Sequence, residues 1–127
     1  MTRINCIPVS ELCDKHLIAE YRELPRVFKL ARQSYLMEKI PQSYTLGTGH
    51  VKFFYDKLLF LYNRQHDITN EMLKRNFKPQ FNADTLIVWK NTKEKLWGDW
   101  HPSEVDMAIN RERISQRLSK MITALDQ

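Results

Sequence analysis

Apolar side chains recur at alternating spacings of four and three residues from position 17 to position 35, and this repeat constrains the fold most. At about 100° per residue, such a repeat places its members on one face of a helix. The predicted buried face consists of Leu17, Tyr21, Leu24, Phe28, Ala31 and Tyr35. The opposite face carries a basic stripe of Lys15, Arg22, Arg26 and Lys29, and one flank carries His16 and Glu23.

Two residues set the predicted course of this first helix. Ser10 precedes the repeat and is a suitable N-cap, because its hydroxyl can accept a hydrogen bond from an unpaired amide of the first turn. Pro25 lies inside the repeat and has no amide hydrogen, so we expect a kink at the turn that carries the arginines.

A second helix is predicted after the turn-forming Gly47-Thr48-Gly49, whose short glycine motif lacks the lysine of a phosphate-binding loop. Its buried side should consist of Val51, Phe54, Leu58, Leu61, Ile68 and Met72. Gln65 is the polar member of that side, and a residue of this kind is most often hydrogen-bonded in a core.

A third helix is predicted to begin after His101-Pro102, with Ser103 as its cap and Asp106 as a capping-box acid. Its apolar members are Met107, Ile114, Leu118, Met121 and Leu125. Arg113, Arg117 and Lys120 form a second basic stripe along it. The stripes of the first and third helices are typical of solvated faces, but two of them also suit a phosphate backbone.

The connections lack sustained periodicity. They cover residues 40–45 and 77–99, and only the run at 86–89 has the β-branched character of a strand. Because no second strand is indicated, that run should pack as an irregular segment. We expect a compact all-α fold, with residues 1–127 forming a single domain of three main helices joined by long irregular connections.

Charge and cysteine usage narrow the class of protein. Lys and Arg outnumber Asp and Glu by 20 to 15, giving a net charge of +5 and a pI near 9.3, which favours a phosphate-bearing partner only weakly. The two cysteines form no disulfide framework, and the four histidines show no metal-ligand spacing. With no signal peptide or long apolar run, we expect a cytoplasmic protein that does not bind a membrane and holds no metal.

Thr2 is a candidate nucleophile if Met1 is removed. The exposed α-amine has a reference pKa near 8, so roughly a tenth of it is unprotonated at neutral pH, far more than for a typical lysine. Neighbouring cations such as Arg3, Arg22 and Arg26 would lower this pKa further. The alternative is that Thr2 merely begins an ordinary terminus.

Glu23 also has two interpretations. Its neighbours Arg22 and Arg26 make it a candidate for a solvated ion pair that contributes little to stability. If the amino terminus folds over this turn, however, its carboxylate could stabilise a cationic sugar or iminium and transfer protons. His16 lies on the same flank, where a surface or partly packed imidazole is the ordinary alternative.

Two long blocks of the chain resemble one family. The first is Met1-Thr2-Arg3-Ile4-Asn5 followed by Ala19-Glu20-Tyr21-Arg22-Glu23-Leu24-Pro25-Arg26-Val27-Phe28, and the second is Gly49-His50-Val51 with Phe53-Phe54-Tyr55-Asp56-Lys57-Leu58. A weaker third block runs from Gly98-Asp99 to Arg113. They are similar to the pyrimidine-dimer DNA glycosylases of phage, the ultraviolet-repair endonuclease V family.

The resemblance implies an all-α DNA repair enzyme that needs no cofactor and acts on damaged double-stranded DNA. In that family the threonine amine attacks the sugar of the 5′ pyrimidine of a cyclobutane dimer, displaces the base and forms an imine. β-Elimination then cuts the strand, so the enzyme is both a glycosylase and an abasic-site lyase, and a base opposite the lesion is flipped out of the stack.

By position, Thr2 matches the nucleophile and Glu23 the essential carboxylate. The matched DNA-binding positions are Arg3, Lys15, His16, Arg22, Arg26, Arg113 and Arg117. Lys15 replaces a glutamine of the family pattern, and Arg117 replaces a lysine, so positive charge is kept or added.

The family's tail rich in tryptophan and tyrosine has no counterpart in residues 121–127, so the amine chemistry is better supported than the lesion preference. Stacking by Trp89, Trp97 and Trp100 could partly substitute for that tail, or these residues could anchor the core. Two alternatives follow: an abasic-site lyase with little or no dimer excision, and a helical DNA-binding protein without catalysis. In each case we expect a monomer.

Overall fold

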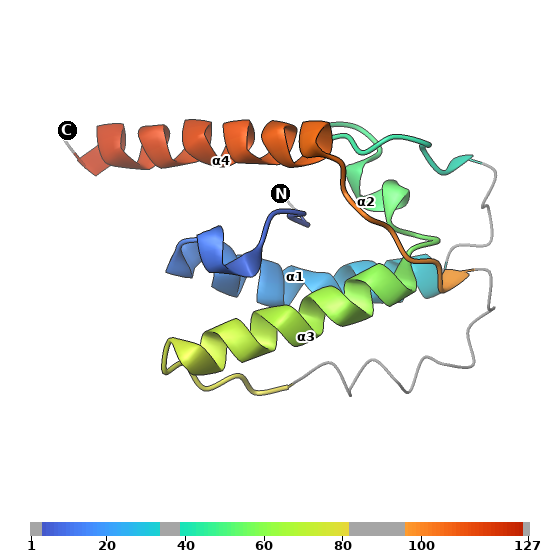
Figure 1. Cartoon of the computed structure of the whole chain (residues 1–127), viewed down its shortest axis with the longest axis horizontal. Helices are drawn as coiled ribbons and strands as arrows, with labels where there is room; N and C mark the ends of the chain where they lie inside the picture. The colour runs from blue at the N-terminus through green and yellow to red at the C-terminus, as the bar shows by residue number, and fades with distance from the viewer. Residues whose placement is uncertain (1–3, 34–38, 82–95, 126–127) are drawn as a thin grey trace.

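The structure is a computed structural model that describes residues 4–33, 39–81 and 96–125. These residues form a 3₁₀ helix, η1 (Val9–Glu11), and four α-helices: α1 (Asp14–Gln33), α2 (His50–Phe53), α3 (Leu58–Lys74) and α4 (Glu104–Leu125). Helices α1 and α3 pack side by side, and α4 crosses the molecule on the other side of the N-terminal segment (Figure 1). The predicted all-α fold is confirmed, and the one β-bridge among the described residues joins Lys57 to Trp97.

The periodicity of the first helix is confirmed. The apolar side of α1 is buried from Leu17 to Ala31, whereas the four members of the basic stripe are exposed. Tyr35 lies outside the described residues. The helix continues through Pro25 to Gln33.

The predicted start of this helix is wrong. Ser10 lies inside η1 rather than at an N-cap, and α1 begins at Asp14. The reason is Leu12, whose side chain is buried and whose backbone is extended (φ −80°, ψ 138°), so the chain changes direction there. Burial of this apolar side chain competes successfully with an additional helical turn.

The predicted second helix is divided in two by a turn at residues 54–57. The backbone amides of Leu59 and Phe60 donate to the carbonyl oxygen of Gly98, at 3.2 and 3.4 Å, instead of to a preceding helical turn. Gly98 in turn donates to Asp56 O at 3.1 Å, and a Cβ at Gly98 would lie 2.6 Å from that oxygen. The segment around Gly98 therefore satisfies the first amides of α3, and only glycine fits so close to the backbone.

Aromatic rings fill the core at the end where α2 and α3 meet. Trp100 lies 5.0 Å from both Phe53 and Phe60 between ring centroids, and it stacks on Tyr44 at 5.4 Å. Trp97 packs edge-on against Phe28 at 5.3 Å. Both tryptophans thus pack as core anchors, whereas the expectations for Trp89 and for the run 86–89 lie outside the described residues.

The third predicted helix is confirmed as α4, together with its cap. Ser103 Oγ accepts from the amide of Asp106 at 3.1 Å, and the amide of Ser103 donates to Asp106 Oδ2 at 2.9 Å. This reciprocal pair is a capping box with aspartate in the acidic position. Ile114 is buried, and Met107 and Leu118 pack partly buried against the core.

Candidate active site

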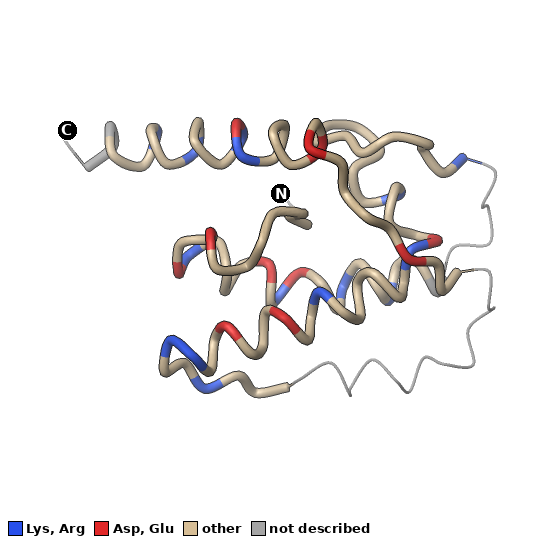
Figure 2. Tube along the Cα trace, viewed as in Figure 1, with Lys and Arg blue, Asp and Glu red and all other residues tan. Residues whose placement is uncertain are grey.

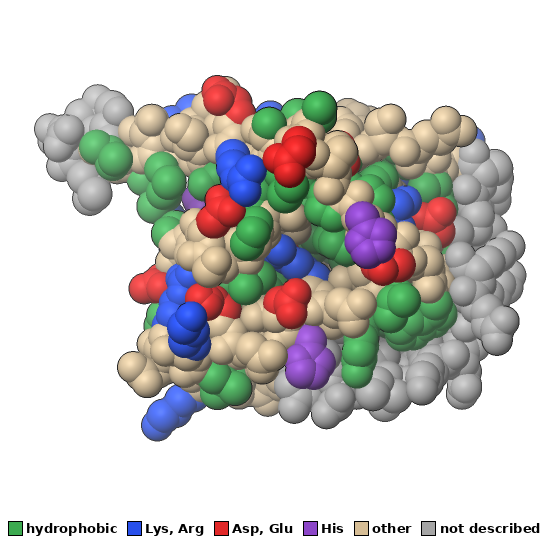
Figure 3. Space-filling view, viewed as in Figure 1, with side chains coloured by type: hydrophobic (Ala, Val, Ile, Leu, Met, Phe, Trp, Pro, Cys, Tyr) green, Lys and Arg blue, Asp and Glu red, His purple; other side chains and the backbone are tan. Residues whose placement is uncertain are grey.

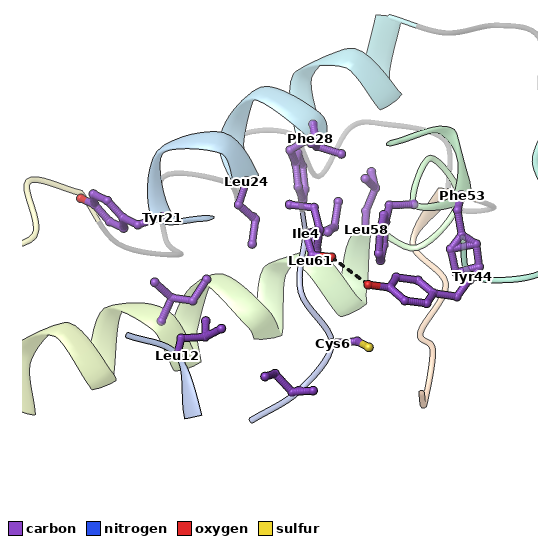
Figure 4. Close-up of a cluster of buried hydrophobic side chains, with 14 of the residues drawn as sticks. Ile4, Cys6, Leu12, Tyr21, Leu24, Phe28, Tyr44, Phe53, Leu58 and Leu61 are labelled. Atoms are coloured by element: carbon purple, nitrogen blue, oxygen red, sulfur yellow. Dashed lines mark hydrogen bonds between the residues drawn. The ribbon is translucent and has the colours of Figure 1, made fainter. Parts of the chain in front are cut away.

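The N-terminal segment Ile4–Ile7 lies buried between α4 on one side and α1 and α3 on the other (Figure 1). Ile4 is fully buried among core side chains that include Phe28 and Leu61, and its carbonyl oxygen accepts a hydrogen bond from Tyr44 (Figure 4). The segment Ile4–Ile7 therefore runs through the interior, between three helices, rather than along the surface.

A buried polar network surrounds this segment. Asn5 Nδ2 donates to Glu20 Oε1 of α1 at 2.9 Å, and Asn110 Nδ2 of α4 donates to Asn5 Oδ1 at 2.8 Å. Arg64 of α3 forms a bidentate pair with Glu20, with N–O distances of 2.7 and 3.1 Å, and also donates to the carbonyl of Ile7. Because the pair is buried and its remaining atoms are hydrogen-bonded, it ties α1, α3 and the segment together.

A cavity of about 90 Å³ lies beside this network. Its walls come from the N-terminal segment, α1 and α4, and consist of Asn5, His16, Ala19, Glu20, Glu23, Ile114 and Arg117. Three predicted site residues meet here: an imidazole and a carboxylate from α1 and a guanidinium from α4. A carboxylate beside basic groups in a partly enclosed space can stabilise a transient cation and exchange protons with it.

Glu23 is half-buried at this cavity. Its Oε2 lies 3.7 Å from Nη1 of Arg26, whose side chain is 67% exposed, so the expected ion pair is present. An exposed pair at this distance restrains the carboxylate only weakly. Glu23 therefore lines the cavity and also contacts the basic stripe of α1.

Three other predicted DNA-binding residues do not line this cavity. Lys15 and Arg22 are exposed on α1. Arg113 lines a different groove, between α4 and the loop at Leu46, so the structure does not bring it to Glu23. Figure 2 shows basic residues along both α1 and α4, on either side of the N-terminal segment.

The face of the molecule in Figure 3 carries acidic and basic side chains interspersed, not one positive patch. The structure contains surface ion pairs, with Arg111 Nη2 2.8 Å from Glu11 Oε2 and Arg75 Nη1 3.0 Å from Asp14 Oδ1. In the described part of the chain, the exposed basic stripe of α1 has one salt bridge to an acidic side chain, that between Arg26 and Glu23.

Thr2 and Arg3 lie outside the described residues. Their predicted roles therefore stay predictions, as do the DNA contacts of the basic residues. Among the residues that the structure places, no group of three His, Cys, Asp or Glu side chains could hold a metal ion. None of the described helices is both long and apolar enough to cross a membrane.

The buried network includes three residues that were not among the predicted site residues. Glu20, Arg64 and Asn110 occupy apolar-face positions of their helices, each three or four residues from buried hydrophobic neighbours, and this mismatch was the available signal. For Gln65 burial was expected and is complete, but the expected hydrogen bond is absent: both atoms of its amide group lack a partner in the described structure.

Comparison with known families agrees with this geometry. A family model described as pyrimidine dimer DNA glycosylase matches residues 1–85. The matched part includes the N-terminal segment, all of α1 and the α2–α3 unit, and hence Glu23, His16 and most of the buried network. Because the match covers more than half of the 127 residues, the chain belongs to the pyrimidine dimer DNA glycosylase family.

Proposed function

We propose that this DNA repair glycosylase is bifunctional, with the α-amine of Thr2 as nucleophile and Glu23 as its catalytic carboxylate. The family supports a glycosylase that acts on ultraviolet-damaged DNA. The observation that carries the finer proposal is the cavity that Asn5 and Glu23 share, because Asn5 follows Thr2 by only three residues.

The proposed reaction begins when the unprotonated amine attacks C1′ of the 5′ pyrimidine nucleotide of a cyclobutane dimer. A C1′–N bond to Thr2 forms, the glycosidic bond breaks, and the departing base takes up a proton. Opening of the sugar ring then gives an imine between C1′ and the threonine nitrogen, and the protonated imine is a cation. The carboxylate of Glu23 would stabilise this cation electrostatically.

Strand cutting follows from the imine. Loss of a proton from C2′ leaves an electron pair that forms a C2′–C3′ double bond and expels the 3′ phosphate, and the cationic nitrogen makes this proton acidic. Water finally hydrolyses the imine and releases the amine. Glu23 is the proposed proton carrier, and the half-buried carboxylate at a cavity wall suits that task.

Duplex binding is assigned to the basic residues of α1 and α4. Lys15, Arg22 and Arg26 are exposed on α1, and Arg113 and Arg117 extend the positive charge along α4. Contacts of this kind hold phosphates without reading sequence, so affinity should fall steeply with salt.

Borohydride trapping tests the proposal, because the reductant converts an imine into a stable covalent adduct. We expect an adduct with dimer-containing DNA and with abasic-site DNA. An adduct on abasic DNA alone would indicate a lyase with little dimer excision, and none on either substrate would indicate a DNA-binding protein without catalysis. One additional residue placed before Thr2 should abolish the adduct, because it replaces the amine by an amide.

Glu23→Gln tests the carboxylate. It removes the charge but keeps the shape, so binding to damaged DNA should persist while turnover falls by about 10²–10⁴-fold. Asp67→Asn is the matched control, since Asp67 is an exposed carboxylate of α3 and its loss should leave turnover unchanged. Near-normal turnover of Glu23→Gln would contradict the assigned role.

A further inference from the structure

Side chains hold the backbone of the N-terminal segment in place of other backbone groups. None of the described backbone–backbone hydrogen bonds outside the helices involves Ile4–Ile7. Instead, the amide of Ile4 donates to His50 Nε2 at 2.9 Å, and the amides of Cys6 and Ile7 donate to Asn110 Oδ1 at 2.7 and 3.3 Å. Buried amides must find acceptors, and these two side chains supply them, while Tyr44 and Arg64 donate to the carbonyl oxygens of Ile4 and Ile7.

The hydrogen bonds of His50 determine its tautomer. Nδ1 lies 2.7 Å from the carbonyl oxygen of Thr45, which can only accept, so Nδ1 carries the hydrogen. In the neutral ring Nε2 then has a free electron pair, which is what the amide of Ile4 requires. The ring is buried and lies edge-on to Tyr44 and Phe54, at 5.8 and 5.5 Å between centroids. His50 is therefore oriented on both sides as a fixed acceptor.

Asn110 is oriented in the same way from α4. Its Oδ1 faces the two amides, while its Nδ2 donates to Asn5 Oδ1 at 2.8 Å. Asn5 is itself fixed by its bond to Glu20. Asn110 is fully buried, and all of its side-chain polar atoms are used.

We propose that His50 and Asn110 are positioning residues that set the reach of the terminal amine into the Glu23 cavity. This inference rests on the proposed function. The two acceptors grip the segment at two points, Ile4 and Cys6–Ile7, so it can neither slide along its own axis nor rotate about it. Neither residue lines the cavity, so neither is a catalytic residue.

The hydrogen bond at Ile4 matters most for the position of the amine, because Ile4 is only two residues from Thr2. Each residue extends the chain by at most about 3.6 Å, so covalent bonds alone keep the nitrogen of Thr2 within about 7 Å of that of Ile4. A fixed Ile4 therefore confines the amine to a sphere of about this radius, whereas a loosened Ile4 adds its own displacement to the range that the amine can sample. Misplacement of a reacting group by about 1 Å can cost 10²-fold in rate.

Two variants of His50 separate positioning from folding. His50→Met removes the acceptor but keeps an unbranched side chain of similar length, whereas His50→Gln keeps an oxygen that can accept from the amide of Ile4. Thr69→Val is the control, because it removes a buried hydrogen bond, Thr69 Oγ1 to Gln65 O at 2.8 Å, and leaves the bonds of the segment intact. Each variant is measured well below its melting temperature.

The functional readout is the single-turnover rate of borohydride-trapped adduct on saturating abasic-site DNA, beside the Kd for DNA that carries an uncleavable abasic analogue. We expect His50→Met to lower the rate by about 10–100-fold while Kd changes less than twofold. His50→Gln should recover most of the rate, and Thr69→Val should keep the wild-type rate.

Amide hydrogen exchange supplies the structural readout. The amides of Ile4, Cys6 and Ile7 should be protected in the wild type, and His50→Met should expose Ile4 first. A wild-type trapping rate in a folded His50→Met protein would overturn the positioning role and leave the proposed function intact. A wild-type protein that gives no adduct at all would overturn the proposed function and, with it, this inference.

Discussion

The Glu20–Arg64 pair offers a quantitative test of the buried network, and Glu20→Gln is the simplest perturbation. The side chains of Glu20 and Arg64 are 1% and 7% exposed, so the substitution leaves a guanidinium charge in the interior without its counter-charge. Glutamine keeps the volume and one carbonyl oxygen. The bidentate pair of 2.7 and 3.1 Å is nevertheless reduced to a contact between the charged guanidinium and a neutral amide, whose NH₂ group also faces a donor.

The expected loss is large for a domain of this size. Removal of one partner from a buried pair costs about 3–5 kcal/mol, because the remaining charge stays desolvated. Total stability of such a domain is about 5–15 kcal/mol, so the variant should lose a large share of its free energy of unfolding. The additional bond from Asn5 to Glu20 Oε1, at 2.9 Å, favours the upper half of this range.

Urea unfolding followed by circular dichroism measures this loss, with Asp67→Asn as the exposed control. The control should change the free energy of unfolding by less than about 0.5 kcal/mol. The reasoning would be refuted if Glu20→Gln lost less than about 1 kcal/mol of its free energy of unfolding while the slope of that free energy against urea concentration stayed the same. It would mean that the pair is solvated or that Arg64 has another way to satisfy its charge.

Three further predictions concern features away from the cavity. Ser103→Ala removes the reciprocal cap of α4 and should cost about 1 kcal/mol in urea unfolding; no change would show that the cap is not formed in solution. Burial raises the pKa of the Cys6 thiol to about 11, so in the folded protein iodoacetamide at neutral pH should modify the partly exposed Cys13 and leave Cys6 unmodified, and equal labelling by mass spectrometry would contradict this. The hydrogen-bonded Arg111 holds the pKa of Glu11 below its ordinary value of 4.5, so the pair stabilises the fold above that value and the contribution is lost as pH falls through the lowered pKa. Arg111→Gln should therefore lower the melting temperature slightly at neutral pH and by less in acid, and a difference that grows in acid would be the wrong sign.

Local periodicity predicted the positions of α1, α3 and α4, but not the division between α2 and α3. Val51, Phe54 and Leu58 fit one helical repeat, so nothing nearby in the sequence indicates a break. The break depends on Gly98, about 40 residues later, whose carbonyl accepts the first amides of α3. Periodicity reports which residues are buried, and it contains no information on which distant backbone group will compete for a hydrogen bond.

The candidate site was predictable to the extent that it depends on one helix. His16 and Glu23, seven residues apart, were expected on one flank of α1, and they do line one cavity. Arg113 and Arg117 belong to one stripe of α4 and yet line different grooves, because α4 runs across the boundary between the N-terminal segment and the loop at Leu46. Such a crossing is a tertiary feature that spacing along one helix does not contain.

The only sign of the buried network in the sequence is a set of polar residues at apolar-face positions of the helices. Glu20, Arg64 and Asn110 each interrupt an apolar face, which suggests that they are paired. Their partners lie 15 to 105 positions away along the chain, as with Asn5, which contacts both Glu20 and Asn110. The sequence predicted neither these pairings nor the route of the N-terminal segment through the interior.

Identification of the nitrogen that carries the sugar tests the central claim most directly. The mature protein is trapped with borohydride on dimer-containing DNA, digested with nuclease and protease, and analysed by tandem mass spectrometry. We predict that the reduced sugar remnant is attached to the α-nitrogen of Thr2 in a chain that has lost Met1. Strand cleavage without any adduct, or a remnant attached to a lysine side chain, would contradict the account.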